Sequence, residues 1–163
     1  MTRIRSATLR HEGGMRFAAT TGSTRTIVYG DAFDQNELSP VETIVVSLAA
    51  CSAMDVVAIA MKKRQQFDRY AVHVEAEQRD EYPQILSRVR VVHEMAGPGV
   101  EEAAIRRAIE LSATKYCPVN AMLSAGATEV HHAYRVINTG ANPFDAAGEV
   151  VITGPYRRPD VIA

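Results

Sequence analysis

The chain has 163 residues, 47% hydrophobic and 23% charged, with 10 glycines, 7 prolines and a net charge of −1. This composition is typical of one globular domain with its own core; it excludes disordered and low-complexity chains and gives no general attraction to nucleic acid or to an acidic membrane. The two cysteines are too few for a disulfide-built secreted scaffold, and no apolar stretch follows the N-terminal charges, so we expect a cytoplasmic protein without a signal peptide.

Three short strands are predicted at the start of the chain, over residues 4–10, 15–20 and 25–29. The sequence Glu12-Gly13-Gly14 between the first two is typical of a hairpin turn, because glycine adopts the backbone angles that tight turns require. A polar loop over residues 31–38 follows.

A long helix is predicted from Pro40 to about Arg64. Ser39 before the proline and Glu42 three residues later form the pattern of a capping box. The longest charge-free run, residues 43–54, has 12 residues, and a bilayer span needs about 20, so we expect a buried core helix. Because this helix is apolar nearly all round, a second subunit is expected to cover part of it.

The rest of the chain alternates between strands and helices. Hairpin-connected strands with helices segregated between them predict an α+β fold. We assign residues 1–137 to one domain and 138–163 to a C-terminal extension with a possible edge strand at Val150-Val151-Ile152. The expected elements are strands over 70–79 and 85–95, a helix over 100–114, a break at Cys117-Pro118, a short helix from Pro118 to about Gly126, and a strand over 128–137.

The histidines show no metal-binding pattern. His131 and His132 are neighbours on a predicted strand and would point to opposite faces, and His11, His73 and His93 are isolated in the sequence. The spacings HxH, HxxxH and CxxC are absent, as are a glycine-rich phosphate loop and a GxSxG motif. We therefore expect neither a metal site nor a cofactor.

The two cysteines are the strongest candidates for chemistry. Cys51 lies halfway along the long helix, and Cys117 lies at a helix N-terminus, where free N–H groups favour a thiolate. From the residues alone, each is either a small core residue or a reactive thiol. Asp55, one turn after Cys51, shares its helix face and would disfavour a thiolate there. It is either hydrogen-bonded to neighbouring backbone or an anchor for an arginine.

Two blocks of sequence resemble motifs of the OsmC/Ohr family, the osmotically inducible and organic hydroperoxide resistance proteins. The first runs from Ser39 to Arg64 and contains Leu48-Ala49-Ala50-Cys51-Ser52-Ala53-Met54-Asp55; the second contains Lys115-Tyr116-Cys117-Pro118-Val119-Asn120. The pattern Ser-Pro-x-Glu followed by Cys-Ser-x-x-Asp-Val-Val is closer to a less characterised OsmC-like branch. The resemblance implies antiparallel sheets with a long buried central helix, and an intertwined homodimer with active sites at the subunit interface.

The resemblance also implies a thiol-dependent peroxidase that reduces organic hydroperoxides or hydrogen peroxide and is restored by an external dithiol. Cys51 would be the peroxidatic thiolate and Cys117 the resolving thiol. Family members support the thiolate with an arginine from the N-terminal strands and a glutamate on the central helix. Arg16 is the nearest candidate arginine and Arg25 the other. Glu42 stands nine residues ahead of Cys51, about 180° around the helix, and is better placed to cap the helix than to serve the thiol.

Two further hypotheses belong to other classes. In the first, the protein binds an apolar molecule without turnover, in a pocket at the subunit interface lined by Leu48, Met54 and similar residues. In the second, the protein is a purely structural dimer. Peroxide consumption together with titration of the thiols separates the enzyme from both.

Overall fold

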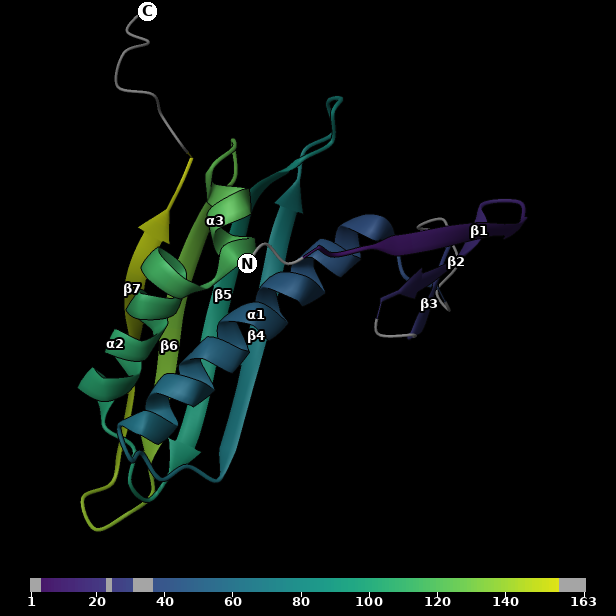
Figure 1. Ribbon diagram of the computed structural model, residues 1–163. Helices are drawn as coiled ribbons and strands as arrows, with labels where there is room; N and C mark the ends of the chain where they lie inside the picture. The colour runs from purple at the N-terminus through teal and green to yellow at the C-terminus, as the bar shows by residue number, and fades with distance from the viewer. Residues whose placement is uncertain (1–3, 23–24, 31–36, 156–163) are drawn as a thin grey trace, which may run out of the picture. The chain divides into compact units, whose positions relative to one another are not determined.

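The computed structural model describes residues 4–22, 25–30 and 37–155, which form two compact units, residues 1–44 and 45–163. Most of the polar loop predicted over residues 31–38 therefore lies outside the described residues. The helical elements are α1 (Pro40–Lys62), α2 (Glu102–Leu111), a π-helical turn (Ser112–Tyr116) and α3 (Pro118–Ser124) (Figure 1). The strands are β1 (Ala7–Gly13), β2 (Arg16–Thr21), β3 (Thr26–Tyr29), β4 (Arg69–Gln78), β5 (Leu86–Gly97), β6 (Glu129–Asn138) and β7 (Phe144–Thr153).

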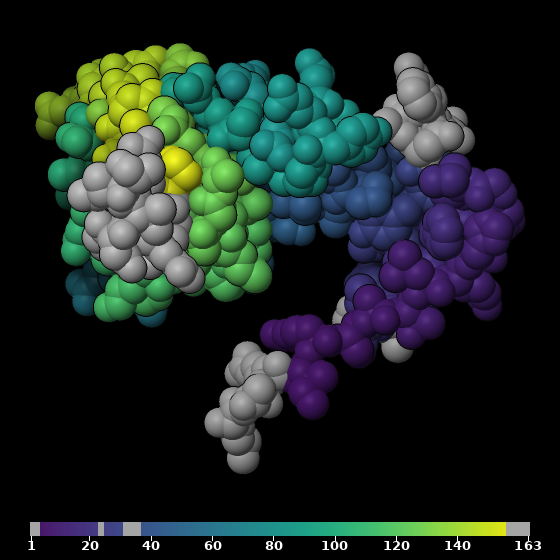
Figure 2. Space-filling view, turned by 90° about the horizontal axis from the view of Figure 1, so that it is seen from above, coloured from purple at the N-terminus to yellow at the C-terminus, as the bar shows by residue number. Residues whose placement is uncertain are grey.

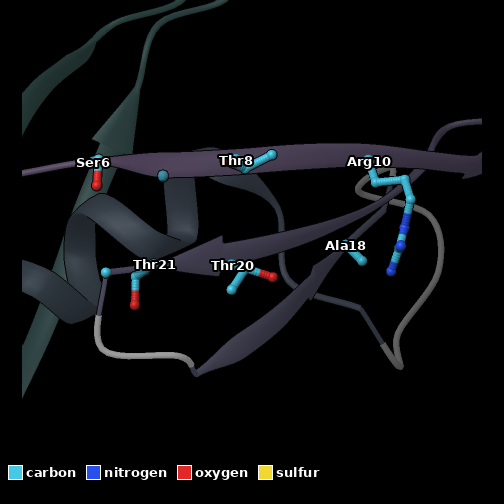
Figure 3. A pocket seen from close by; sticks show the side chains of 8 residues that line it. Ser6, Thr8, Arg10, Ala18, Thr20 and Thr21 are labelled. Carbon is cyan, nitrogen blue, oxygen red and sulfur yellow. The ribbon is translucent and has the colours of Figure 1, made fainter.

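The first unit holds a three-stranded antiparallel sheet in the order β1-β2-β3. Gly13 and Gly14 have φ angles of 114° and 56°, which confirms the predicted glycine turn between β1 and β2. Period-two alternation gives the sheet a polar side and an apolar side. On the polar side a hollow of about 330 Å³ is lined by Thr8 and Arg10 of β1 and Thr20 of β2, among others (Figure 3).

The start of α1 is fixed by a reciprocal cap. The Ser39 N–H donates to Glu42 Oε2 at 2.7 Å, and the Glu42 N–H donates to Ser39 Oγ at 3.2 Å. The predicted capping box is therefore confirmed, and the hydrogen bond from the Ser39 backbone lowers the pKa of Glu42. The helix ends at Lys62, and Arg64 follows with a left-handed φ of 58°.

Within the chain, α1 is buried along one row and exposed elsewhere. Leu48, Ser52, Val56 and Ala60, spaced four residues apart, are fully buried. Other apolar side chains on the helix are open to solvent: Val46 is 57% exposed, Met54 74% and Met61 65%. One chain therefore covers only part of the helix, as expected, and its coverage by a second subunit stays a prediction. By length and composition α1 could also cross a membrane, a test that a soluble core helix passes equally well.

The second unit contains a four-stranded sheet in the order β4-β5-β6-β7 (Figure 1). Figure 2 shows the surface from above, with the segment of β4 and β5 in teal and that of β7 in yellow. The prediction of antiparallel pairing is wrong for β5 and β6, which run parallel. The segment with α2 and α3 forms the long crossover that a parallel pair requires.

The possible edge strand of the C-terminal extension is the ten-residue β7, which pairs antiparallel with β6. It is much longer than the three-residue apolar run that pointed to it. The domain boundary predicted at residue 137 stays a prediction; β6 and β7, on either side of it, belong to one sheet.

The helices cover one face of this sheet and form the main core with it (Figure 1). Inward-facing residues alternate along β5 and β6, as expected for strands with one buried face. The main cluster of buried residues comprises Val56, Ala60, Met95, Val100, Ile105, Ala108, Ile109, Tyr134 and Val136.

Candidate functional site

Cys51 and Cys117 are 66 positions apart in the sequence, and the second unit brings their sulfur atoms together. Both sulfurs and a carboxylate oxygen of Asp55 lie within 4.8 Å of one another. Cys51 and Asp55 are one turn apart on α1, so the predicted shared face is confirmed. Cys117 is buried, with 3% exposure, whereas Cys51 and Asp55 are half-buried. Solvent can therefore reach the site at Cys51 and Asp55 on α1, whereas Cys117 is shielded from it.

The π-helical turn and Pro118 together position Cys117. The Cys117 N–H donates to the Ser112 carbonyl at 2.9 Å and closes the turn. The backbone then becomes extended at Cys117, with φ −73° and ψ 105°, as expected before a proline. Cys117 is the N-cap of α3, and the Asn120 N–H donates to its sulfur at 3.3 Å.

The expectation that the helix N-terminus favours a thiolate at Cys117 is wrong. Burial raises the pKa of its thiol to about 12, with a further contribution from the hydrogen bond to Cys51. The Asn120 N–H lowers the pKa, but its effect is smaller than that of burial. Cys117 is therefore held as a neutral thiol, although it lies at a helix N-terminus as predicted.

Asp55 is held by a side chain that sequence reasoning did not identify. Its Oδ2 accepts a hydrogen bond from Ser112 Oγ at 3.0 Å. Neither expected role is seen: the contact is not to neighbouring backbone, and among the described residues no lysine or arginine forms an ion pair with Asp55. Ser112 comes from the π-helical turn, so one short segment positions both Cys117 and the carboxylate.

A buried hydrogen-bond network continues from this contact into the core. Ser52 Oγ lies 3.3 Å from Ser112 Oγ and 3.2 Å from His93 Nε2. On the other side of the imidazole ring, Tyr70 Oη lies 2.7 Å from His93 Nδ1. Ser52, Ser112 and His93 are fully buried. Paired polar groups of this kind fix the positions of the elements that carry them.

His93 and His132 form a buried pair, although they are far apart in the sequence. Their rings stack with centroids 6.1 Å apart, and His132 Nε2 lies 3.0 Å from Asn120 Oδ1. Burial lowers the pKa of His93 to about 3 and that of His132 to about 4. His131 instead contacts Glu129 on the other face of β6, so the predicted opposite orientation of the two neighbouring histidines is confirmed.

The other predicted supporting residues lie in the first unit. Arg16 forms an ion pair with Glu12, Nε to Oε2 at 3.2 Å, and another with Glu37. Arg25 is exposed just before β3, and Glu42 is engaged in the helix cap. A role for any of these side chains toward the thiols stays a prediction.

The apolar pocket lined by Leu48 and Met54 is expected at a subunit interface and stays a prediction. Leu48 is fully buried, whereas Met54 is 74% exposed. Within the chain, an apolar hollow of about 680 Å³ occurs in the first unit, on the side of the sheet opposite to the hollow shown in Figure 3. Its lining includes Leu9, Phe17 and Ile27.

The sequence and the fold of this chain both match those of known proteins. A family profile described as OsmC-like protein matches residues 33–132. The chain belongs to the OsmC-like protein family. Protein YhfA of Escherichia coli (strain K12) is 32% identical over 124 residues, which cover 76% of this chain and 92% of YhfA.

Solved structures of similar proteins agree with this assignment. A hypothetical protein from Aquifex aeolicus VF5 aligns with a TM-score of 0.75 and 27% identity, covering 83% of this chain and 97% of that one. An organic hydroperoxide resistance protein from Elizabethkingia anophelis aligns with a TM-score of 0.66 over 85% of this chain and 99% of its own. At 14% identity this second likeness shows the fold alone. The OsmC-like α+β fold expected from the two cysteine blocks is therefore confirmed.

Proposed function

We propose that the protein is a thiol-dependent peroxidase that reduces organic hydroperoxides or hydrogen peroxide through Cys51 and Cys117. The observation that carries this proposal is the approach of the two sulfurs to within 4.8 Å, from segments distant in the sequence. A disulfide needs sulfurs about 2.05 Å apart, so a modest side-chain movement suffices to form one. Membership of the OsmC-like family, which resembles the hydroperoxide resistance proteins in fold, supports the same chemistry.

In the first step the Cys51 thiolate attacks the O–O bond of the peroxide. A sulfur–oxygen bond forms, the O–O bond breaks, and the leaving alkoxide takes a proton to become an alcohol, or water when the substrate is hydrogen peroxide. Cys51 becomes a sulfenic acid and has given up two electrons. The exposure of the two residues supports this assignment, because Cys51 is half-buried and Cys117 is 3% exposed.

In the second step the Cys117 sulfur attacks the Cys51 sulfenic acid. A disulfide forms and one water leaves, made of the sulfenic hydroxyl and the thiol proton. An external dithiol then reduces the disulfide by exchange and leaves as its own disulfide. The protected position of Cys117 suits a thiol whose partner is another residue of the chain and not a free substrate.

Single-turnover kinetics with an organic hydroperoxide test the assignment of the two thiols. We expect Cys51→Ser to abolish peroxide consumption. Cys117→Ser is expected to complete one turnover and then stall, with Cys51 trapped as a sulfenic acid or over-oxidised. If Cys51→Ser retains the wild-type rate, the peroxidase proposal is wrong.

A second candidate function is the binding of a small apolar molecule without turnover. The hollow of about 680 Å³ in the first unit favours it, since small-molecule sites usually measure about 300–1,000 Å³ and have apolar walls. Phe17 is part of that wall. Saturable binding of an apolar fluorescent probe that is lost in Phe17→Asp, in a protein that consumes no peroxide, would favour this function over the peroxidase.

A further inference from the structure

The three groups at the centre of the candidate site are also a set of metal ligands. Two sulfurs and one carboxylate oxygen, all within 4.8 Å of one another, come from Cys51, Cys117 and Asp55. We propose that the reduced protein binds one thiophilic divalent cation, of which Zn²⁺ is the natural example, through these three side chains. This inference goes beyond the proposed peroxidase function, because it concerns metal binding by the resting dithiol.

The donor set matches the chemistry of Zn²⁺. Zinc binds thiolate sulfur at about 2.3 Å and carboxylate oxygen at about 2.0–2.2 Å, with tetrahedral geometry. Ligand atoms around such an ion lie roughly 3.3–3.8 Å apart. The three atoms therefore need to move closer by about 1.5 Å at most, which side-chain rotation can supply. Three protein ligands leave one position for water, and the half-buried Cys51 and Asp55 leave a side open for it.

The Asp55 carboxylate is free to take a cationic partner. Among the described residues, Asp55 forms no ion pair with lysine or arginine, and its side-chain partner is the neutral Ser112 hydroxyl. Thiols bind a metal ion as thiolates and release their protons on binding, so the neutral Cys117 thiol would exchange its proton for the ion. The ion would then offset the charge of the carboxylate and of the thiolates formed on binding.

Hydrogen bonds around the ligands resemble those that orient metal ligands in proteins. Ser112 Oγ donates to Asp55 Oδ2 at 3.0 Å, and the Asn120 N–H donates to the Cys117 sulfur at 3.3 Å. Ser112 is itself held by the buried Ser52. Such outer contacts fix the direction of a ligand and affect metal affinity by roughly 10–100-fold. Two of the three ligands are therefore already oriented.

Metal binding is tested on the fully reduced, full-length chain without oxygen or peroxide. Cd²⁺ is the spectroscopic probe, because thiolate-to-Cd²⁺ charge-transfer absorption reports sulfur ligation directly, and Zn²⁺ affinity is measured by competition with a chromophoric chelator. We expect one ion per chain. Cys51→Ser and Cys117→Ser are each expected to lose about half of the absorption, since each removes one of the two thiolates.

The nearly isosteric variant Asp55→Asn tests the carboxylate and is matched by Asp68→Asn, which alters an exposed aspartate after α1. We expect Asp55→Asn to weaken Zn²⁺ binding at least about tenfold and Asp68→Asn to leave it unchanged. Wild-type affinity in Asp55→Asn, or no charge-transfer absorption in the wild-type protein, would overturn the inference. Because no peroxide is present, failure of the peroxidase proposal would leave this result unaffected.

Discussion

His93 and His132 lie on adjacent parallel strands and stack their rings inside the core, with centroids 6.1 Å apart. The register pairs Val91 of β5 with His132 of β6, so His93 is the next inward residue along β5. Tyr70 and Ser52 contact His93 from β4 and α1, and Asn120 contacts His132 from α3. Both imidazole rings are fully buried and are kept neutral by that burial.

This pair predicts that the protein loses stability on mild acidification. The pKa is about 3 for His93 and about 4 for His132 in the folded protein, against 6.5 for an unperturbed histidine. Below about pH 6.5 the unfolded chain binds protons that the folded protein does not, so the free energy of unfolding falls as the pH is lowered toward about 4. Between about pH 7 and pH 5 we expect a loss on the order of 2 kcal/mol for each histidine.

Urea unfolding at the two pH values measures this loss. We expect His93→Gln to be less stable than the wild type at both pH values. The change in its free energy of unfolding between the two pH values should be about half that of the wild type, because one of the two titrating groups is gone. Equal unfolding free energies of the wild-type protein at about pH 7 and pH 5 would contradict the account of the buried pair.

The capping box predicts a local effect on stability. Ser39→Ala removes the oxygen that accepts the Glu42 N–H and is expected to lower the free energy of unfolding by about 1 kcal/mol. Ser39→Asp keeps an acceptor at the same place and should remain close to the wild type. Urea unfolding of the two variants gives the comparison, and a fully stable Ser39→Ala protein would show that the cap contributes nothing.

The open apolar side of α1 predicts a homodimer. Val46, Met54 and Met61 are each more than half exposed, and burying side chains of this kind is worth about 1.5–3 kcal/mol each. Light scattering at micromolar concentration should therefore give twice the chain mass of 17.8 kDa. Met54→Glu is expected to shift the protein toward the monomer, whereas Tyr82→Glu, at the exposed β4–β5 turn, should not. A stable 17.8 kDa wild-type particle would exclude the dimer.

The arginine expected from the family resemblance can be identified by substitution. The family resemblance implies that an arginine of the N-terminal strands favours the Cys51 thiolate, so we expect Arg16→Ala to slow the reaction of Cys51 with an organic hydroperoxide about tenfold. Arg25→Ala is the matched control and should react at the wild-type rate. Stopped-flow measurement of the first turnover separates the two. If Arg25→Ala reacts slowly and Arg16→Ala reacts at the wild-type rate, Arg25 is the residue that supports the Cys51 thiolate.

Much of this arrangement could be predicted from local patterns. The capping box fixed the start of α1, Gly13-Gly14 fixed the first hairpin, and the four-residue spacing of Cys51 and Asp55 placed both on one helix face. Each of these depends on residues a few positions apart, for which backbone geometry alone determines the outcome. The resemblance supplied the relation between the two cysteine segments.

Long-range pairing is what the sequence did not reveal. The alternation along β5 and β6 is the same for a parallel and an antiparallel pair, so it could not indicate the parallel register that stacks His93 on His132. The sequence did not indicate that Ser112 contacts Asp55, because this contact depends on the π-helical turn in which Ser112 lies. The raised pKa of Cys117 was missed because burial, which outweighs the helix terminus, is a property of the folded packing.

The most direct test of the redox proposal is the mass of the intact protein after one equivalent of an organic hydroperoxide. We expect the reduced chain to lose two hydrogens as Cys51 and Cys117 form one intramolecular disulfide, and peptide mapping to locate the bond between them. Dithiothreitol should restore the original mass. Addition of oxygen atoms to two independently oxidised cysteines, with no peptide joining Cys51 to Cys117, would contradict the proposal.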